Sequence, residues 1–318
     1  MKTSTSKRLR WNVAIWLAAG LFMTGTAGMA AGPIMPDPKA EARHQPQVEE
    51  TANGIPLVNI TAPSSGGVSR NEYETFNVPD KGAILNNSYT LSKTELAGYV
   101  QGNNNMAERP AKIIVNEVTG AGSTSMDGFL EVAGNRADVV IANPNGITVN
   151  GGGFINTGKA FLTTGKPVYD GEDHLQRFDI TGGDILIEGK GLGGKETESL
   201  AILSRAVKIN AGIWAKDLHI TTGANTVDAK TLEASAIEGK GGRPAFALDT
   251  AAIGGMYAGR ITLVGTEKGL GVNNSGTWSA EDNLTLDWNG DLKNSGTIYS
   301  KGNTDLRASH LENDKTIA

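Results

Sequence analysis

"NSGTWSAEDNLTL" at residues 274–286 and "NSGTIYSKGNTDL" at residues 294–306 are two copies of one pattern, set twenty residues apart. The alignment places Trp278 opposite Ile298 and Leu286 opposite Leu306. A period near twenty residues, with two or three short strands in each period, is typical of a parallel β-helix, whose successive coils stack about 4.8 Å apart. The alternative interpretation is a chance pair of similar hairpins.

The repeated asparagines predict a ladder at one corner of that helix. Asn274 and Asn294 open the two copies, and a third copy begins at Asn313. Their side-chain amides are expected to stack and to bond to one another from coil to coil. Because the third copy is incomplete, we expect this sequence to be the front part of a longer solenoid.

Apolar pairs at strand spacing recur upstream between glycine, asparagine and aspartate, for example Val139 with Ile141 and Leu218 with Ile220. The pattern predicts an all-β fold, a right-handed, single-stranded parallel β-helix of the pectin-lyase type with an N-terminal β cap and small antiparallel excursions. At roughly twenty residues per coil we expect about a dozen coils after residue 55, with cap strands in residues 56–76. Ser92 and Glu95 have capping-box spacing and predict one short helix near residue 95.

Composition narrows the class of protein. The 318 residues include 42 glycines and 25 asparagines but no cysteine, which predicts many turns and a fold without disulfides. A net charge of −5 offers no basic face for a phosphate backbone, so we expect no nucleic-acid partner.

The first residues have the pattern of an export signal. Lys2, Lys7, Arg8 and Arg10 precede an apolar run at residues 11–22 that is short for a membrane span. We predict a signal peptide at residues 1–30, cleaved after Ala30 or, as the second choice, Ala31. Residues 31–54 are expected to be a poorly ordered, proline-rich linker because charges and four prolines replace the apolar periodicity.

An enzyme is the first alternative from another class, since β-helices also serve polysaccharide-degrading enzymes. Glu172, Asp173, His174 and Asp179 form the densest titratable group, and paired carboxylates with histidine can bind a cation or act as acid and base. We interpret the group as a solvated hairpin tip. No nucleophile motif, phosphate loop or zinc pair occurs, so we predict no catalytic, cofactor or metal site.

Several motifs occur together in one order along the chain after residue 55. They are "NEVTG" at 116–120, "ANPNGI" at 142–147, "GGGFINT" at 151–157, "LTTGKP" at 162–167, "LSRA" at 203–206, "TTGAN" at 221–225 and "GGMYAGRITLVGTEKGLGVNNSG" at 254–276. In this order they resemble the amino-terminal two-partner-secretion domain of filamentous haemagglutinins, haemolysins and contact-dependent growth-inhibition exoproteins.

The resemblance implies a function in export. Such a domain targets a large exoprotein for secretion and nucleates its folding, and it is recognised by the POTRA domains of a cognate outer-membrane β-barrel transporter after passage through the Sec machinery and the periplasm. The protein would reach the cell surface or the medium. The resemblance also implies that residues 55–265 are the secretion domain and that residues 266–318 begin the haemagglutinin-type repeats.

The resemblance assigns secretion competence to particular residues, through partner recognition or through early folding. They are Asn116, Glu117, Asn143, Pro144, Asn145, Gly146 and Ile147. An upstream variant motif comprises Asn103, Asn104, Asn105 and Met106, where Asn104 stands in place of the family's proline. We expect the turn there to be kept.

Two further questions stay open at the level of sequence. A stand-alone adhesin could bind host glycans through aromatics such as Trp214, Tyr257, Trp278 and Trp288, and a β-helical polysaccharide-degrading enzyme is the other alternative. The cargo could be an adhesin, a haemolysin or a toxin, in which case contacts with a host cell or a neighbouring bacterium would belong to downstream regions absent from this sequence.

Overall fold

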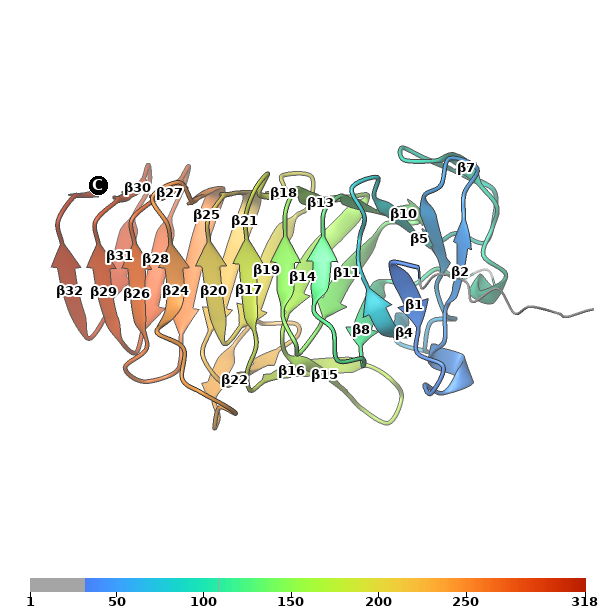
Figure 1. Cartoon of the computed structure of the whole chain (residues 1–318), viewed down its shortest axis with the longest axis horizontal. Coiled ribbons are helices and arrows are strands. Elements are labelled where there is room, and N and C mark those ends of the chain that lie inside the picture. The colour runs from blue at the N-terminus through green and yellow to red at the C-terminus, as the bar shows by residue number, and fades with distance from the viewer. Residues whose placement is uncertain (1–31, 108) are drawn as a thin grey trace, which may run out of the picture. The chain divides into compact units, whose positions relative to one another are not determined.

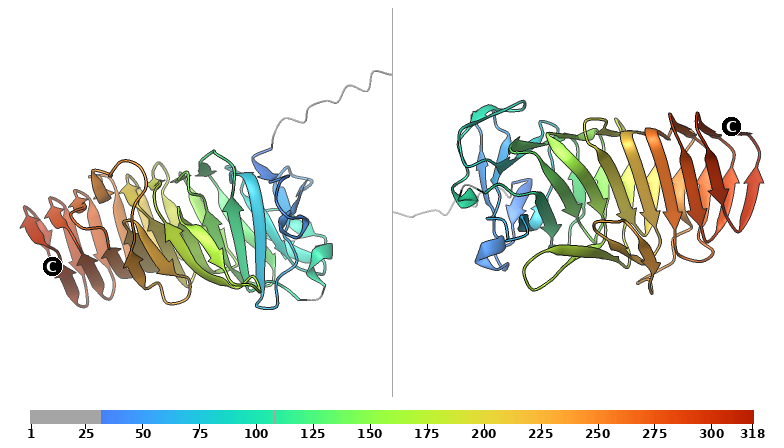
Figure 2. Two further views of the ribbon diagram at one scale, coloured as in Figure 1. Left: turned by 90° about the horizontal axis from the view of Figure 1, so that it is seen from below. Right: turned by 180° about the vertical axis from the view of Figure 1, so that it is seen from behind.

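The computed structural model describes residues 32–107 and 109–318, so the expected signal peptide and its cleavage site at Ala30 or Ala31 lie outside the described residues. Residues Pro33–Ala318 form one compact unit. Its strands stack side by side along one axis, with residue number rising steadily from coil to coil (Figures 1 and 2). The predicted all-β parallel β-helix is confirmed.

Three faces run the length of this unit, and on each face the strands pair in parallel with the coil before and the coil after. Face 1 comprises β3 (Pro56–Asn59), β5 (Ala83–Asn87), β10 (Phe129–Gly134), β13 (Gly152–Ile155), β18 (Leu192–Gly194), the first parts of β21 (Gly212–Thr222) and β25 (Gly255–Gly265), β27 (Thr277–Ala280), β30 (Thr297–Ser300) and β33 (Thr316–Ile317). Face 2 comprises β4 (Val68–Phe76), β8 (Ile113–Val118), β11 (Ala137–Ala142), β14 (Thr157–Thr163), β19 (Ser199–Ser204), the second parts of β21 and β25, β28 (Leu284–Trp288) and β31 (Thr304–Arg307). Face 3 comprises β9 (Thr124–Met126), β12 (Ile147–Val149), β17 (Asp184–Ile187), β20 (Ala206–Ile209), β24 (Phe246–Thr250), β26 (Gly271–Asn274), β29 (Asp291–Asn294) and β32 (His310–Asn313).

The core lies inside the coils and is built from every second residue of each strand. On face 2, Ile141, Leu162, Ile202, Ile220 and Leu263 occupy matching positions in five successive coils, and none of them is exposed. Alternation at period 2 therefore places one aliphatic side chain per coil into a continuous stack. Burial of such a side chain stabilises the fold by about 1.5–3 kcal/mol relative to exposure.

A second, smaller core lies outside the coils. Two antiparallel excursions contribute β15 (Lys166–Tyr169), β16 (Leu175–Ile180), β22 (Asn225–Asp228) and β23 (Ala234–Ala236), which pair into a four-stranded sheet. We call it the covering sheet. Its Phe178, Ile180 and Val227 pack on outward-facing apolar residues of face 2, among them Phe161 and Leu203. The predicted antiparallel excursions are thus confirmed.

Face 1 holds ten stacked segments within residues 32–107 and 109–318, fewer than the dozen coils expected. Three long coils explain the difference: Ile84 pairs with Glu131, 47 residues later, and two further coils carry the covering sheet. Ala160 pairs with Leu200, and Leu218 pairs with Ile261, so each of these two coils uses about twice the predicted twenty residues. The additional residues of both coils form the excursions.

The expected linker is ordered structure instead. Within residues 31–54, β1 (Ile34–Pro36) pairs antiparallel with β4, a 3₁₀ turn η1 (Ala42–His44) follows, and β2 (Gln47–Glu50) pairs antiparallel with β3. These strands form the cap, whereas residues 56–76, expected as cap material, already belong to the parallel coils. The prolines do not prevent pairing because Pro36 ends a short edge strand, where a missing backbone N–H is tolerated.

The short helix expected near residue 95 is also wrong. Residues Ser92–Thr94 form β6, which pairs antiparallel with β7 (Gly98–Val100). The backbone N–H groups of Glu95 and Leu96 donate to the carboxylate of Glu131 at 2.7 and 2.9 Å, and Thr94 Oγ1 donates to the carbonyl of Gly98. A carboxylate from a neighbouring coil therefore accepts the N–H of Glu95, which the Ser92 side chain would have accepted in a capping box, and also that of Leu96.

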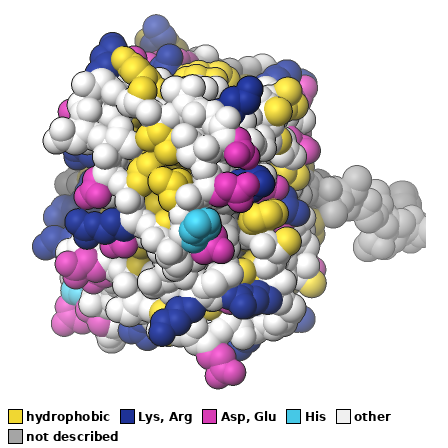
Figure 3. All heavy atoms as spheres, turned by 90° about the vertical axis from the view of Figure 1, so that its left-hand side faces the viewer, with side chains coloured by type: hydrophobic (Ala, Val, Ile, Leu, Met, Phe, Trp, Pro, Cys, Tyr) yellow, Lys and Arg dark blue, Asp and Glu magenta, His cyan; other side chains and the backbone are white. Residues whose placement is uncertain are grey.

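The last described coil leaves apolar side chains in contact with solvent. Leu306 and Ile317 are only partly buried, and Leu311 is 45% exposed. Figure 3 looks onto this end, where hydrophobic side chains gather near the middle of the surface. Among the described residues, no helix has the length and apolar character to cross a membrane.

Candidate functional site

The Asn-Pro-Asn-Gly motif forms the corner between β11 and β12. The buried Asn143 side chain donates to the carbonyl of Gly122 at 2.9 Å and to Thr124 Oγ1 at 3.0 Å, while its Oδ1 accepts the backbone N–H of Asn145 at 2.9 Å. Gly146 takes a φ of +111°, which favours glycine. One buried amide thus holds the turn and anchors it to the preceding coil.

The same corner presents two residues to solvent. Pro144 and Asn145 are exposed, whereas Asn143 is buried, and Ile147, which follows Gly146, begins β12 inside the core. Proline limits the backbone freedom of this surface point. The motif therefore combines a buried anchor with a rigid exposed tip.

Asn116 lies at the centre of the core, on β8. Its Oδ1 accepts a hydrogen bond from Tyr73 Oη at 2.9 Å, and its Nδ2 donates to the carbonyl of Val140 at 3.1 Å. Burial raises the pKa of Tyr73 well above its usual range, so the phenol stays protonated and donates. Asn116 links β4, β8 and β11, which belong to three successive coils.

The structure brings the two motifs together. Asn145 Nδ2 donates to the carbonyl of Gly120 at 2.8 Å, and Gly120 is the last residue of "NEVTG". Asn116 and Ile141 are also register partners in the parallel pair β8–β11. We call residues 116–124 with 141–147 the motif corner.

The upstream variant motif lies elsewhere, in the connection from β5 on face 1 to β8 on face 2, where residues Asn104–Met106 form the 3₁₀ turn η2. Asn103 Oδ1 accepts the backbone N–H of Asn105 at 3.0 Å, and Asn103 Nδ2 donates to the carbonyls of Ile60 and Asn86. This is the bonding pattern of Asn143 and Asn145. The turn forms with Asn104 in the proline position.

Glu117 faces outward from β8 but is buried beneath the covering sheet. Arg70 Nη2 lies 3.5 Å from Glu117 Oε2 and 2.8 Å from Glu72 Oε1, and its guanidinium lies 4.4 Å from the centre of the Tyr169 ring. Burial raises the pKa of Glu117, although the charge of Arg70 opposes that shift. His44 Nδ1 approaches Glu72 Oε1 at 3.0 Å, so the cluster also ties the cap to the first coils.

Sequence reasoning did not identify Tyr73, Arg70 or Glu72 as neighbours of the motif residues. All three lie on β4, in which Ser69, Asn71 and Tyr73 point inward while Arg70 and Glu72 point outward. The alternation in "VSRNEYETF" carries the signal, because two charges at every second position of a long strand predict one polar outer face. Nothing local showed that this face would be covered.

The predicted corner ladder is a chain of amide contacts. Asn274 Nδ2 donates to Asn294 Oδ1 at 2.8 Å, and Asn294 Nδ2 donates to Asn313 Oδ1 at 2.7 Å. Asn274 and Asn294 are buried, whereas Asn313 is exposed in the last coil. The ladder lies on face 3, far along the chain from the motif corner.

The titratable residues that suggested an enzyme are engaged in ion pairs around the β15–β16 turn. Asp173 pairs with Arg43 at 2.7 Å, and Asp179 with Arg177 at 2.8 Å, while His174 contacts Asp170 at 2.9 Å. Within the described part of the chain, no group of three or more His, Cys, Asp or Glu residues could hold a metal ion. The Asp173–Arg43 pair holds the turn against the cap, whereas the other two pairs lie within the excursion itself.

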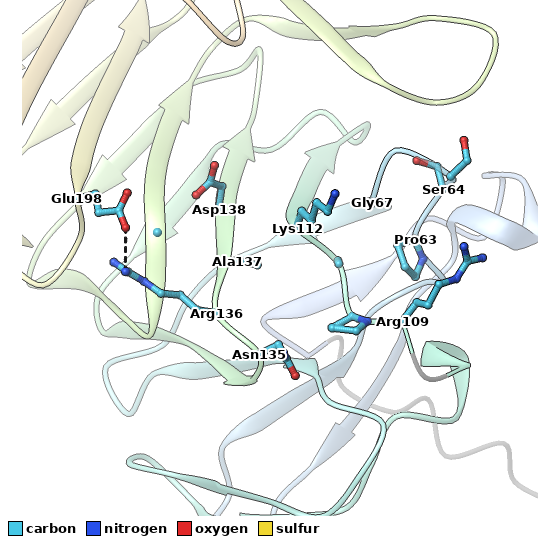
Figure 4. A pocket seen from close by; sticks show the side chains of 14 residues that line it. Pro63, Ser64, Gly67, Arg109, Lys112, Asn135, Arg136, Ala137, Asp138 and Glu198 are labelled. Carbon is cyan, nitrogen blue, oxygen red and sulfur yellow. Dashed lines mark hydrogen bonds and ion pairs between the residues drawn. The ribbon is translucent and has the colours of Figure 1, made fainter.

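A groove of about 610 Å³ crosses the corner between faces 1 and 2 and is lined by charged residues (Figure 4). Its carboxylates have partners, since Glu198 pairs with Arg136 at 2.9 Å and Asp138 accepts the backbone N–H of Lys159 at 2.7 Å. Burial raises the pKa of Asp138, and the hydrogen bond from Lys159 opposes that shift only in part. The lining contains no pair of unengaged carboxylates for acid–base chemistry.

Comparison with known proteins gives a consistent result. Residues 33–298 match the family model of the TPS secretion domain. The chain is 43% identical over 298 residues to "Toxin CdiA" of Yersinia pestis and 44% identical over 272 residues to "16S rRNA endonuclease CdiA" of Enterobacter cloacae subsp. cloacae, which cover 86% and 83% of it. The solved filamentous hemagglutinin secretion domain superposes with a TM-score of 0.73 at 31% identity, over 89% of this chain and 97% of that one.

The match with the two curated relatives is confined to a small part of them. The aligned regions amount to 9% of the Yersinia protein and 8% of the Enterobacter protein. The names of these relatives describe proteins more than ten times as long as the shared region. The shared region itself corresponds to the secretion domain in the solved structure.

Proposed function

Because the chain belongs to the TPS secretion domain family, whose exoproteins reach the cell surface through a cognate outer-membrane transporter, we propose that the motif corner is the part of this domain on which export depends. POTRA domains of the transporter are the proposed reader, after passage through the Sec machinery and the periplasm. The domain acts as an address and as the first folded segment, and it performs no chemistry of its own.

One observation carries this proposal. The motif corner joins a buried anchor, Asn143, to an exposed tip, Pro144 and Asn145, and ties both to the end of "NEVTG" through Gly120. A recognition point must be exposed and rigid, while a folding nucleus must connect coils early. The corner has both properties, so it can serve recognition, early folding or both in turn.

The extended, unfolded chain makes the first contact with the transporter. Before the coils close, strands such as β11 have unpaired backbone groups that can add to the edge of a POTRA sheet, with main-chain hydrogen bonds supplying affinity. Outside the cell, each new coil stacks on the coil before it and buries about one more row of side chains on each face. This burial releases free energy coil by coil, which favours movement of the chain out of the cell.

The experiment compares three variants that are co-expressed with the cognate transporter. We expect Asn143→Ile and Asn116→Ala to lower the amount of protein outside the cell at least tenfold relative to Asn294→Ala, a matched change at the buried ladder. Equal secretion of all three variants would refute the proposal. Urea denaturation of the purified variants in parallel measures the free energy of unfolding of each. A secretion defect that merely follows from lost stability can then be recognised.

A binding assay separates the two roles of the corner. Purified POTRA domains are mixed with each variant, unfolded in urea and diluted immediately before mixing. Loss of POTRA binding by Asn143→Ile assigns the corner to recognition, whereas a secretion defect with normal POTRA binding assigns it to folding. Pro144→Ala, which changes only the exposed tip, should reduce secretion in the first case and leave it unchanged in the second.

The parent exoprotein is, we infer, a carrier of the contact-dependent growth-inhibition type. The observation in favour is the 43–44% identity to CdiA proteins, against 31% to the filamentous hemagglutinin domain. A competition culture tests this. Cells that express the whole protein should inhibit contacted neighbours lacking a cognate immunity protein, and unchanged growth of those neighbours would favour an adhesin or a haemolysin.

A further inference from the structure

One line of outward-facing positions crosses seven successive coils of face 1. In register order it comprises Phe129, Gly153, Gly193, Trp214, Tyr257, Ser279 and Tyr299. We call it the aromatic row. Phe129, Tyr257 and Tyr299 are 45%, 39% and 39% exposed, and Trp214 is partly exposed. With a spacing of about 4.8 Å between coils, the row is about 29 Å long.

Three of the four rings lie against glycines. A Cβ atom added at Gly212 would lie 2.5 Å from Cη2 and Cζ2 of Trp214, and one added at Gly255 would lie 2.9 Å from Cε2 of Tyr257. A Cβ atom at Gly153 would lie 2.4 Å from Cε1 of Phe129. Glycine thus allows each ring to lie close to the sheet, with its other face toward solvent. Trp214 and Tyr257 are nearly parallel, at 16°, with ring centres 6.2 Å apart.

Gly193 has no such structural reason. A Cβ atom there would meet only the carbonyl oxygen of Gly152, at an ordinary 3.7 Å, and its φ lies outside the left-handed region. The backbone at this position therefore has room for a Cβ atom, and strands in general favour β-branched residues over glycine. The effect of glycine at this position is to keep open a notch of about 410 Å³ between Phe129 and Trp214.

Polar side chains border the row. Lys195 and Glu196 line the notch, and Lys195, Lys216 and Glu281 line a second hollow of about 460 Å³ beside Tyr257. Within the part of the chain that the structure describes, no side-chain hydrogen bond or ion pair engages Lys195, Glu196 or Lys216, whereas Glu281 pairs with Lys301. With Lys301 counted, three cations and two carboxylates give the border a net charge of +1.

We propose that the aromatic row binds a linear, uncharged oligosaccharide of about five or six sugar units, lying along the axis of the β-helix, with one unit near each coil spacing of about 4.8 Å. A pyranose ring has an apolar C–H face that stacks on exposed aromatic rings, and a hydroxyl rim that bonds to ammonium and carboxylate groups. Trp214 and Tyr257 form the flat binding surface at the centre of the row. At Gly193 the notch lets one sugar unit lie directly against the strand.

The structure favours a sugar chain over the other polymers. The strands beneath the row are paired on both sides, so a peptide strand finds no sheet edge to extend along these coils. A net charge of only +1, with both signs present, offers little attraction to a nucleic acid or another polyanion. Flat rings in a line with borders of mixed charge fit an uncharged ligand with alternating apolar faces and hydroxyl groups.

Isothermal titration tests the proposal with three probes, cellohexaose, N-acetylchitohexaose and maltohexaose, against the purified secreted chain. We expect at least one probe to bind, Trp214→Ala to weaken that binding at least tenfold, and Gly193→Val to weaken it at least tenfold while the melting temperature stays equal or rises. Phe246→Ala removes an aromatic that is 41% exposed on β24, on face 3 and so outside the row, and should bind as wild type.

Three results would overturn the proposal. They are no binding of any probe at millimolar concentration, wild-type binding by Gly193→Val, and loss of POTRA binding by Gly193→Val, which would give the row to the transporter. The proposal is independent of the export function, because Gly193→Val is expected to be secreted at the wild-type level while Asn143→Ile is not.

Discussion

The hydroxyl of Tyr73 donates a 2.9 Å hydrogen bond to Oδ1 of Asn116, and neither side chain reaches solvent. Tyr73 lies on β4 and Asn116 on β8, which are neighbouring strands of face 2. The second half of the Asn116 amide bonds to the carbonyl of Val140 on the following coil. The first three coils of face 2 are therefore held together by side chains as well as by backbone pairing.

Tyr73→Phe removes one hydroxyl and leaves Asn116 Oδ1 buried without its donor. We expect the free energy of unfolding to fall by about 1–3 kcal/mol, the cost of an unsatisfied buried polar group. Urea denaturation followed by circular dichroism measures this loss. Tyr99→Phe, on the exposed β7, is the control and should change the free energy of unfolding little; an equal effect of both changes would contradict the account.

Asn104→Pro is expected to stabilise the protein by about 0.4–1 kcal/mol, because proline restricts the unfolded chain and Asn104 begins a 3₁₀ turn. The preceding Asn103 has ψ 117°, which suits a residue before proline. Thermal denaturation measures the gain. Asn105→Pro is the matched control and should destabilise, since the N–H of Asn105 donates to Asn103 Oδ1. A loss with Asn104→Pro would mean that its backbone differs from that of Pro144.

His219 is a source of acid sensitivity. Burial lowers its pKa from 6.5 to about 4, so between these values the unfolded chain binds a proton that the folded chain does not. Stability therefore falls as pH falls from 6.5 to about 4. We expect His219→Gln to lose about 1–3 kcal/mol less than wild type over this window.

Denaturation curves at pH 7.5, 5.5 and 4 measure the effect of His219→Gln. His310→Gln, at an exposed position of β32, is the control and should keep the wild-type dependence on pH. Parallel curves for His219→Gln and wild type would show that His219 is not a cause of acid sensitivity.

Arg205 fastens the second excursion to the coils. It forms two hydrogen bonds of 3.0 Å with Glu267 and donates to the carbonyl of Lys240 at 2.7 Å, and its side chain is 8% exposed. Hydrogen bonding from Arg205 lowers the pKa of Glu267. Arg205→Lys keeps the charge but loses the planar fork, so we expect a loss of about 1.5–3 kcal/mol.

Hydrogen exchange detected by mass spectrometry locates that loss. Residues 237–243 should exchange faster in Arg205→Lys than in wild type, because Lys240 is no longer held. The control is Arg260→Lys, whose pair with Asp217 is exposed and should contribute less than about 1 kcal/mol. Unchanged exchange at residues 237–243 would refute this role of Arg205.

The repeat architecture could be predicted because a short stretch of sequence contains the whole pattern of one coil. Each coil must place apolar residues at alternate positions, and Asn274 and Asn294 recur at one corner, so a window of twenty residues contains the rule. The cap could not be predicted in this way. β1 pairs with β4 across about forty residues, and only Ile34 and His44 of its short elements are buried, which leaves no periodic signal.

In the candidate site, too, features set by local sequence could be predicted and features set by distant contacts could not. Turn chemistry in "NPNG" predicted the reversal at residues 143–146, since Pro144 and Gly146 have local conformational preferences. The bond from Asn145 to Gly120 and the coverage of Glu117 by Tyr169 depend on how coils and excursions stack, and nothing in either segment specifies them. The Ser92 signal failed because Glu131, from another coil, accepts the N–H of Glu95 that Ser92 would have accepted in a capping box.

The covering sheet can be completed only after a late segment of the domain has been synthesised. β16 gains its second neighbour only when Asn225–Asp228 arrive, about fifty residues after β16 begins. A chain that has emerged only as far as β21 therefore carries the outer apolar strip of Phe161 and Leu203 under an unfinished lid with an open edge. Folding of the first half of the domain is therefore complete only after a segment from the second half has arrived. A stalled or truncated chain that lacks residues up to 228 would expose apolar surface and would be prone to aggregate.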